Sequence, residues 1–250
     1  MRPNVTRAAL ALACVLAACD SGGNAAPDTL STTPVTASLP ATTTTSPPET
    51  TGSVVPVTGQ PGEIQLSPDG PWTRVDSAPG VTQPGLVYLL MPGVWVWLPT
   101  VEDIPNGVTW VLNEDDLPVI EAYLQARIVF FRATSQDPID LNDPGWEQWY
   151  SDQAVASYAN FLTPHRNLHE TFDTSGGVVL RPTVWGEERS GTTAIVMDCM
   201  LDGGVWRLPD GSLGSDSTLG VTPNGLGARM SAKMGVWKVE SMSREPIACD

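Results

Sequence analysis

Two apolar runs in the first half of the chain have the pattern of β-strands. They cover residues 86–90 and 94–98, and Met91-Pro92-Gly93 separates them. Because Pro-Gly favours a type II turn, the runs predict a hairpin or a pair of buried strands. Both faces of each run are apolar, so we expect this unit to pack against another part of the protein.

A helical spacing of apolar residues runs through positions 113–133. The first residues of this segment are polar and acidic, which favours the start of a helix. A second helical region is predicted to start at Asp143, to break near Ser151 and to end at Pro164.

The last third of the chain has the short apolar segments and Gly-rich turns of a strand-rich region. The strands predicted there cover residues 178–187, 192–201, 205–208, 226–234 and 236–243. Helices followed by a run of antiparallel strands predict the α+β fold class.

Residues 20–62 have a different composition. They are rich in Thr, Pro and Gly and contain no Lys or Arg. Such a segment has too little apolar side chain to offset the entropy of ordering, so we predict a disordered tether.

The net negative charge of the chain argues against some classes of binding partner. It has 28 acidic residues against 13 basic ones, for a net charge of −15. Binding to nucleic acid needs clustered Lys and Arg, so no nucleic-acid partner is expected. No phosphate loop, dinucleotide fingerprint, zinc spacing or calcium loop is present, so we expect no cofactor and no metal.

The N-terminal segment resembles a bacterial lipoprotein signal. Arg2 and Arg7 precede an apolar run over residues 8–16, and Leu16-Ala17-Ala18-Cys19 then has the order of a lipobox. The resemblance implies that Cys19 becomes the first mature residue and carries acyl chains such as palmitate. It places the protein at the extracytoplasmic face of the cell membrane, held there by its lipid anchor. A transmembrane helix is the alternative, but it needs about 20 apolar residues.

The remaining cysteines then form a pair. Cys14 would leave with the signal peptide, so Cys199 and Cys249 are left in an oxidising compartment. We predict that they form a disulfide bond that pins the C-terminus. A catalytic cysteine is the alternative.

The order of elements after residue 113 resembles the nuclear transport factor 2-like (cystatin-like) superfamily, and more narrowly actinobacterial lipoproteins that carry such a domain. The resemblance rests on residues 116–123, 196–199 and 235–239, and on the final Cys249. It implies helices packed on a curved, cone-like antiparallel sheet around a cavity, here preceded by a β-hairpin-like extension. Members of the superfamily include enzymes and also binding or accessory domains.

The expected organisation has four parts. These are a signal peptide at 1–18, a disordered Thr/Pro-rich tether at 19–62, a Trp-rich β extension at 63–112 and a nuclear transport factor 2-like domain at 113–250.

Two charged residues are candidates for a cavity site. Enzymes of this superfamily use an Asp or His as the acid or base, and Asp198 is the matching residue here. The alternatives are a surface Asp198, or one paired with Arg127 or Arg181. Arg127 lies on the apolar stripe of the first helix, as a pocket cation or as a side chain that extends to the edge of the stripe.

Two further groups of residues suggest other sites. Trp95 and Trp97 share one strand face and would stack on sugars if exposed, but core packing is the alternative. His165 and His169 would share a helix face like two zinc ligands, with Glu170 or Asp173 as a third, but exposed histidines on a connector are the alternative.

The function predicted first is a non-enzymatic accessory or small-ligand-binding domain of the cell envelope. Its partner would be a small apolar ligand, an envelope protein or a glycan. A cyclase- or isomerase-like enzyme using Asp198 and a glycan-binding module using Trp95 and Trp97 are the alternatives.

Overall fold

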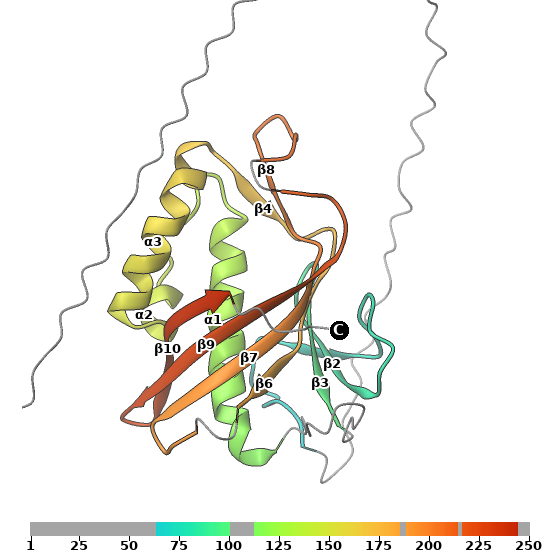
Figure 1. Ribbon diagram of the computed structural model, residues 1–250, viewed down its shortest axis with the longest axis vertical. Helices are drawn as coiled ribbons and strands as arrows, with labels where there is room; N and C mark the ends of the chain where they lie inside the picture. Colours follow the sequence, from blue (N-terminus) through green and yellow to red (C-terminus); the bar gives the residue numbers. More distant parts are fainter. Residues whose placement is uncertain (1–63, 101–112, 186–188, 215–216, 245–250) are drawn as a thin grey trace, which may run out of the picture. The chain divides into compact units, whose positions relative to one another are not determined.

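The computed structural model describes residues 64–100, 113–185, 189–214 and 217–244 (Figure 1). All of them belong to the unit Thr51–Asp250. The signal peptide, Cys19 and the tether lie outside these ranges, as does Cys249, so the predictions on them stay predictions. Within the described ranges, no helix combines the length and apolar character needed to cross a membrane.

The described strands, in chain order, are β1 (Thr73–Val75), β2 (Gly85–Met91), β3 (Val94–Pro99), β4 (Thr171–Asp173), β5 (Val178–Leu180), β6 (Pro182–Val184), β7 (Thr193–Asp202), β8 (Val205–Arg207), β9 (Thr222–Lys233) and β10 (Val236–Arg244). The described helices are the 3-10 turn η1 (Glu114–Asp116), α1 (Leu117–Thr134), α2 (Gly145–Trp149) and α3 (Asp152–Asn167).

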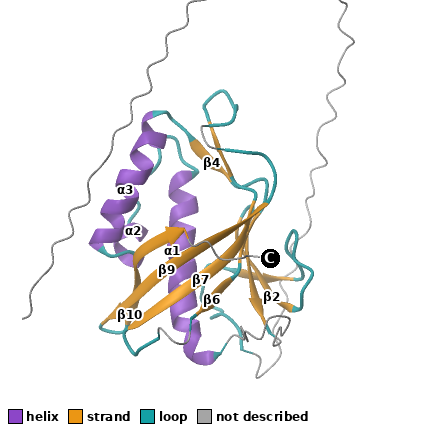
Figure 2. Cartoon of the chain, viewed as in Figure 1, coloured by secondary structure: helices purple, strands orange, loops and turns teal. Residues whose placement is uncertain are grey.

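A large mixed sheet is the main feature of the unit (Figure 2). Its order is β1-β2-β3-β5-β7-β9-β10, and β6 pairs with β7 beside this path. The pair β3–β5 is parallel, and the other pairs of this sheet are antiparallel. Strands β4 and β8 form a separate antiparallel pair.

The predicted fold class is wrong. Strands hold 37% of the described residues and helices 26%, and only α1 and α3 have seven or more residues. The sheet is mixed, so the unit is not the expected set of helices packed on a cone-like antiparallel sheet. The hairpin β2–β3 is also no separate extension, because it joins the same sheet through Val94↔Val178 and Val96↔Leu180.

The position of the hairpin inside the sheet explains why both of its faces are apolar. Side chains on one face, such as Tyr88 and Val96, lie in the main core with α1. The opposite face carries Val87, which forms a second small cluster with Ala78 and Val179. A strand covered on both faces reads as a continuous apolar run.

Helix α1 forms the centre of the main core. It contacts β6, β7, β9 and β10 as well as α2, and Figure 1 shows it running beside these strands. The predicted capping by Asn113 is found one turn earlier: its side chain accepts a hydrogen bond from the Asp116 N–H and caps the 3-10 turn η1, and α1 follows from Leu117 without a side-chain cap of its own. Pro118 lies in its first turn, where no helical partner for its nitrogen is needed.

The second helical region is broken where the sequence predicts. Helix α2 ends at Trp149, and the Ser151 side chain caps α3 by accepting from the Ala154 N–H. The predicted end at Pro164 is wrong, because α3 continues to Asn167.

An ion pair fastens the segment before α2 to α1. The Arg132 guanidinium donates to both Asp143 oxygens at 2.7 and 2.8 Å, and the Gly145 N–H donates to Oδ1 at 2.8 Å. The hydrogen bonds from Arg132 hold the pKa of Asp143 below its usual value.

We expect Asp143→Asn to reduce the free energy of unfolding by about 1 kcal/mol at neutral pH, because half-exposed Arg132 leaves the pair partly screened. The folded-state pKa of Asp143 is lowered, so this stability is present above about pH 4 and is lost as the pH falls through that pKa. Urea unfolding at neutral pH and at about pH 3 checks this. Glu147→Gln on the exposed side of α2 is the control. If Asp143→Asn lowered the free energy of unfolding equally at both pH values, the predicted role of the ion pair would be contradicted.

Candidate ligand-binding site

The structure places Asp198 on the inner face of β7, fully buried between Val196 and Met200. Its Oδ2 accepts a hydrogen bond from the Tyr123 hydroxyl at 2.7 Å. Its Oδ1 accepts from the Arg181 N–H at 2.7 Å. Asp198 is therefore a core residue on β7 that contacts α1 through Tyr123 and the connection between β5 and β6 through Arg181.

Arg127 is also buried, with 4% of its surface exposed. Its guanidinium carbon lies 4.9 Å from the ring centre of Phe130 and 4.7 Å from that of Phe131. Within the described part of the chain its Nε has no hydrogen-bond partner, and no ion pair joins it to Asp198. Arg127 thus packs on aromatic faces instead of extending to solvent.

The surroundings of Asp198 oppose catalysis. Burial raises the pKa of its carboxyl, against the hydrogen bonds from Tyr123 and Arg181 and the charge of Arg127, which lower it. A general base must reach the proton that it removes. Asp198 has no exposed surface, and each of its oxygens already accepts a hydrogen bond from the protein. This geometry favours a structural role.

Trp95 and Trp97 are half-buried on the opposite face of β3, where they pack against the small cluster around Ala78. The Trp97 indole lies so close over Gly85 that a Cβ there would be 2.2 Å from its Nε1. Both rings therefore contribute to packing, and this geometry does not favour their predicted role as an open sugar platform.

The two histidines point to different partners. His165 Nδ1 lies 2.5 Å from buried Glu170 Oε2, and its ring stacks on Trp206 at 3.9 Å. His169 has a left-handed backbone and its Nδ1 lies 2.8 Å from Asp137 Oδ1. In the described ranges no group of three or more His, Cys, Asp or Glu is placed to hold a metal ion.

Cys199 is disulfide-bonded. Its predicted partner Cys249 lies outside the described residues, so the pairing stays a prediction.

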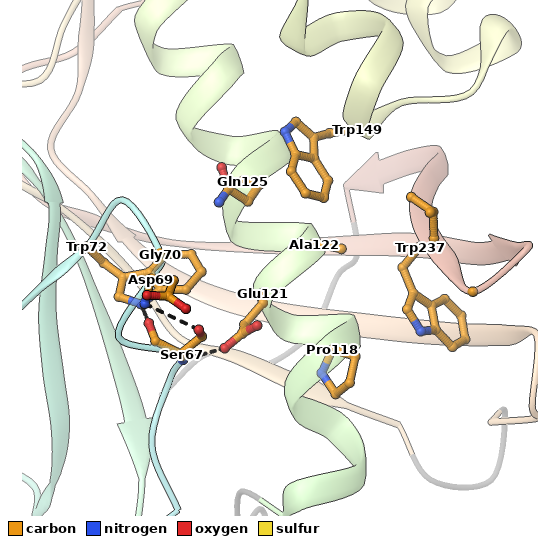
Figure 3. Close-up of a pocket in the computed structure, with 12 residues that line it drawn as sticks. Ser67, Asp69, Gly70, Trp72, Pro118, Glu121, Ala122, Gln125, Trp149 and Trp237 are labelled. Atoms are coloured by element: carbon orange, nitrogen blue, oxygen red, sulfur yellow. Dashed lines mark hydrogen bonds between the residues drawn. The ribbon is translucent and has the colours of Figure 1, made fainter.

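A groove of about 370 Å³ crosses the solvent-facing side of α1 (Figure 3). Three tryptophans line it: Trp72 directly before β1, Trp149 at the end of α2, and Trp237 on β10. All three are partly buried but not covered. Sequence reasoning missed this site, because the three residues are far apart in the chain and nothing in their local pattern links them.

The Trp72 wall is fixed by hydrogen bonds within its own segment. The indole N–H of Trp72 donates to the Ser67 carbonyl at 2.8 Å. The Ser67 N–H donates to Glu121 Oε1 at 2.5 Å, which ties the segment to α1. A Cβ at Gly70 would lie 2.0 Å from the Trp72 ring, so the ring position requires a glycine there.

Contacts of β10 with α2 and with Ser151, the N-cap of α3, hold the other wall. The Ser151 N–H donates to the Val239 carbonyl at 2.9 Å. Lys238 Nζ donates to the Glu147 carbonyl at 2.6 Å. These bonds place Trp149 and Trp237 on the same side of α1, opposite Trp72, as Figure 3 shows.

The floor of the groove is one face of α1. Glu121 and Gln125 lie one turn apart and provide carboxylate and amide groups, while Ala122 is short and leaves space above the helix. In the described ranges no hydrogen bond reaches the Gln125 amide or the second oxygen of Glu121. No Lys, Arg or His is among the described residues that line the groove.

Comparisons with known proteins leave the family open. No protein-family model and no curated protein matches the chain. The chain is similar to the intermembrane space region of the chloroplast protein ARC6, with 10% identity and a TM-score of 0.40 over 53% of this chain and 98% of that one. It is also similar to Bd1075 of Bdellovibrio bacteriovorus, with 10% identity and a TM-score of 0.29 over 62% of each chain. Both TM-scores are below 0.5, so neither similarity assigns a function, and the nuclear transport factor 2-like resemblance stays a prediction.

Proposed function

We propose that this protein is a non-enzymatic binding lipoprotein of the cell envelope whose folded unit holds a small ligand in the groove over α1. The observation that carries the proposal is the groove itself, where three partly buried indoles from three segments of the chain surround the Glu121 carboxylate and the Gln125 amide. Ligand sites combine an apolar lining with a few placed polar groups in this way.

The polar floor argues against the wholly apolar ligand that the sequence resemblance implies. Such a ligand would take the Glu121 carboxylate and the Gln125 amide out of water without returning hydrogen bonds. Burying an unpaired polar group costs about 1–3 kcal/mol. The groove therefore favours a ligand with both flat apolar faces and hydrogen-bonding groups.

The membrane location rests on the lipobox at residues 16–19. We expect Cys19→Ser to move the protein from the detergent phase to the aqueous phase after detergent phase separation of cells, because one residue carries the acyl chains. Cys14→Ser, inside the predicted signal peptide, should leave the partition unchanged. A Cys19→Ser protein that stays in the detergent phase would contradict lipid anchoring.

Fluorine NMR of the full mature chain labelled with 5-fluorotryptophan tests binding. The probes are trisaccharides, choline and decanoate, each added at millimolar concentration. At least one probe should shift the resonances of Trp72, Trp149 and Trp237, assigned by Trp→Phe variants, and leave that of buried Trp146 in place. If no probe shifts any of the three, the proposed function is wrong.

A further inference from the structure

We infer that the ligand of this groove is an uncharged oligosaccharide that spans the two walls. The inference rests on the proposed function and names the class of ligand.

The charge of the lining excludes anionic ligands. The titratable groups of the described lining are Asp69 and Glu121, both acidic, and this lining includes no basic side chain. A phosphate or carboxylate ligand would meet repulsion there, within a chain whose net charge is −15.

The separation of the walls disfavours a compact cation. A single ammonium group gains from aromatic rings that lie within about 6 Å of it on several sides. Figure 3 shows Trp72 on one side of α1 and Trp149 and Trp237 on the other. No ring contact joins any two of these three indoles among the described residues. Rings set apart in this way suit a ligand with two or more flat units.

The Glu121 carboxylate on the floor already has one hydrogen-bond partner in the protein. One Glu121 oxygen accepts the Ser67 N–H, which leaves its other oxygen to accept from a ligand hydroxyl. The Gln125 amide beside it can both donate and accept. Hydroxyl groups satisfy such a mixed set, whereas an ammonium group, which only donates, leaves the Gln125 NH2 without an acceptor.

A pyranose ring has the matching shape, because one face presents C–H groups and the edge carries hydroxyls. The hydrogen bond to Ser67 holds the edge of Trp72, Gly70 packs against the ring, and the part of the ring that lines the groove is its apolar surface. The polar side chains Glu121 and Gln125 point toward Trp72 in Figure 3, whereas Ala122 lies toward Trp237. One sugar unit would thus bond to the floor near Trp72 while the next stacks near Trp237.

Calorimetric titration of the full mature chain tests the inference. The probes are maltotriose, cellotriose and the trimer of N-acetylglucosamine, with their monosaccharides and choline chloride. At least one trisaccharide should bind with a Kd about tenfold or more below that of its monosaccharide. Trp72→Ala and Trp237→Ala should each raise the trisaccharide Kd about tenfold.

Trp185→Ala is the matched control, because Trp185 is 42% exposed and lies outside the groove. The Trp185→Ala variant should bind the trisaccharide with the same Kd as the wild type. Circular dichroism and thermal unfolding verify that each variant is folded, and Trp72→Phe, which keeps an aromatic face, should restore part of the affinity.

The outcomes separate the two proposals. Saturable binding of choline without binding of any trisaccharide overturns the saccharide inference and keeps the proposed function. Trisaccharide binding that Trp72→Ala and Trp237→Ala leave unchanged overturns the assignment to this groove. No binding of any probe overturns both.

Discussion

Replacing Asp198 with alanine is expected to reduce the free energy of unfolding by about 3 kcal/mol. The substitution leaves the buried Tyr123 hydroxyl and the Arg181 N–H without their acceptor. Each unsatisfied buried group costs about 1–3 kcal/mol, and the positive charge of Arg127 also loses a neighbouring anion. Urea unfolding followed by circular dichroism measures the loss. A change below about 1 kcal/mol would contradict the structural role assigned to this residue.

The pH dependence of the free energy of unfolding is a second test of the buried state of Asp198. Burial raises the pKa of Asp198 in the folded state, so the stability from the protonated carboxyl is fully present below about pH 4 and is lost as the pH rises through the folded-state pKa. Asparagine does not titrate. The stability difference between the wild type and Asp198→Asn should therefore shrink from acid to neutral pH, and a constant difference would contradict the burial argument.

Gly70→Ala is expected to weaken ligand binding about as much as Trp72→Ala, by about tenfold in Kd. The added Cβ would lie 2.0 Å from the Trp72 ring, so the indole must leave its position in the wall. The variant removes no chemical group from the groove, and the methyl group that it adds lies against the Trp72 ring, so a loss of affinity equal to that of Trp72→Ala reports the displaced ring. Calorimetric titration with the tightest-binding probe checks it.

Gly191→Ala is the matched control for this substitution. A Cβ there meets no atom within 4 Å, and its backbone is not in the left-handed region. The control should bind like the wild type. Unchanged binding in Gly70→Ala would mean that Trp72 does not contribute a wall of the site.

Local elements of this fold could be predicted from the sequence, but the pairing of strands could not. The capped turn η1 that leads into α1 and the break before α3 follow from side-chain chemistry at Asn113 and Ser151. The parallel pair β3–β5 depends on a contact between segments that are far apart in the chain, which periodicity does not encode. The apolar character of both hairpin faces did indicate that a partner was required.

In the candidate site, too, single residues could be singled out from the sequence, but their arrangement in space could not be predicted. Asp198 and Arg127 stand out in the sequence as charges within apolar segments, and the structure places both in the core. Trp149 looks like part of an apolar helix face, and nothing near Trp72 or Trp237 points to a shared groove. Their proximity to α1 comes from the tie between Ser67 and Glu121 and from the contacts of Val239, which are tertiary interactions.

A crystal structure of the mature protein with its tightest-binding probe tests the central claim most directly. The account predicts ligand density over α1, with flat faces stacked on Trp72 and on Trp149 or Trp237 and a hydrogen bond to Glu121 or Gln125. Density over Trp95 and Trp97, or inside the core beside Asp198, would contradict it.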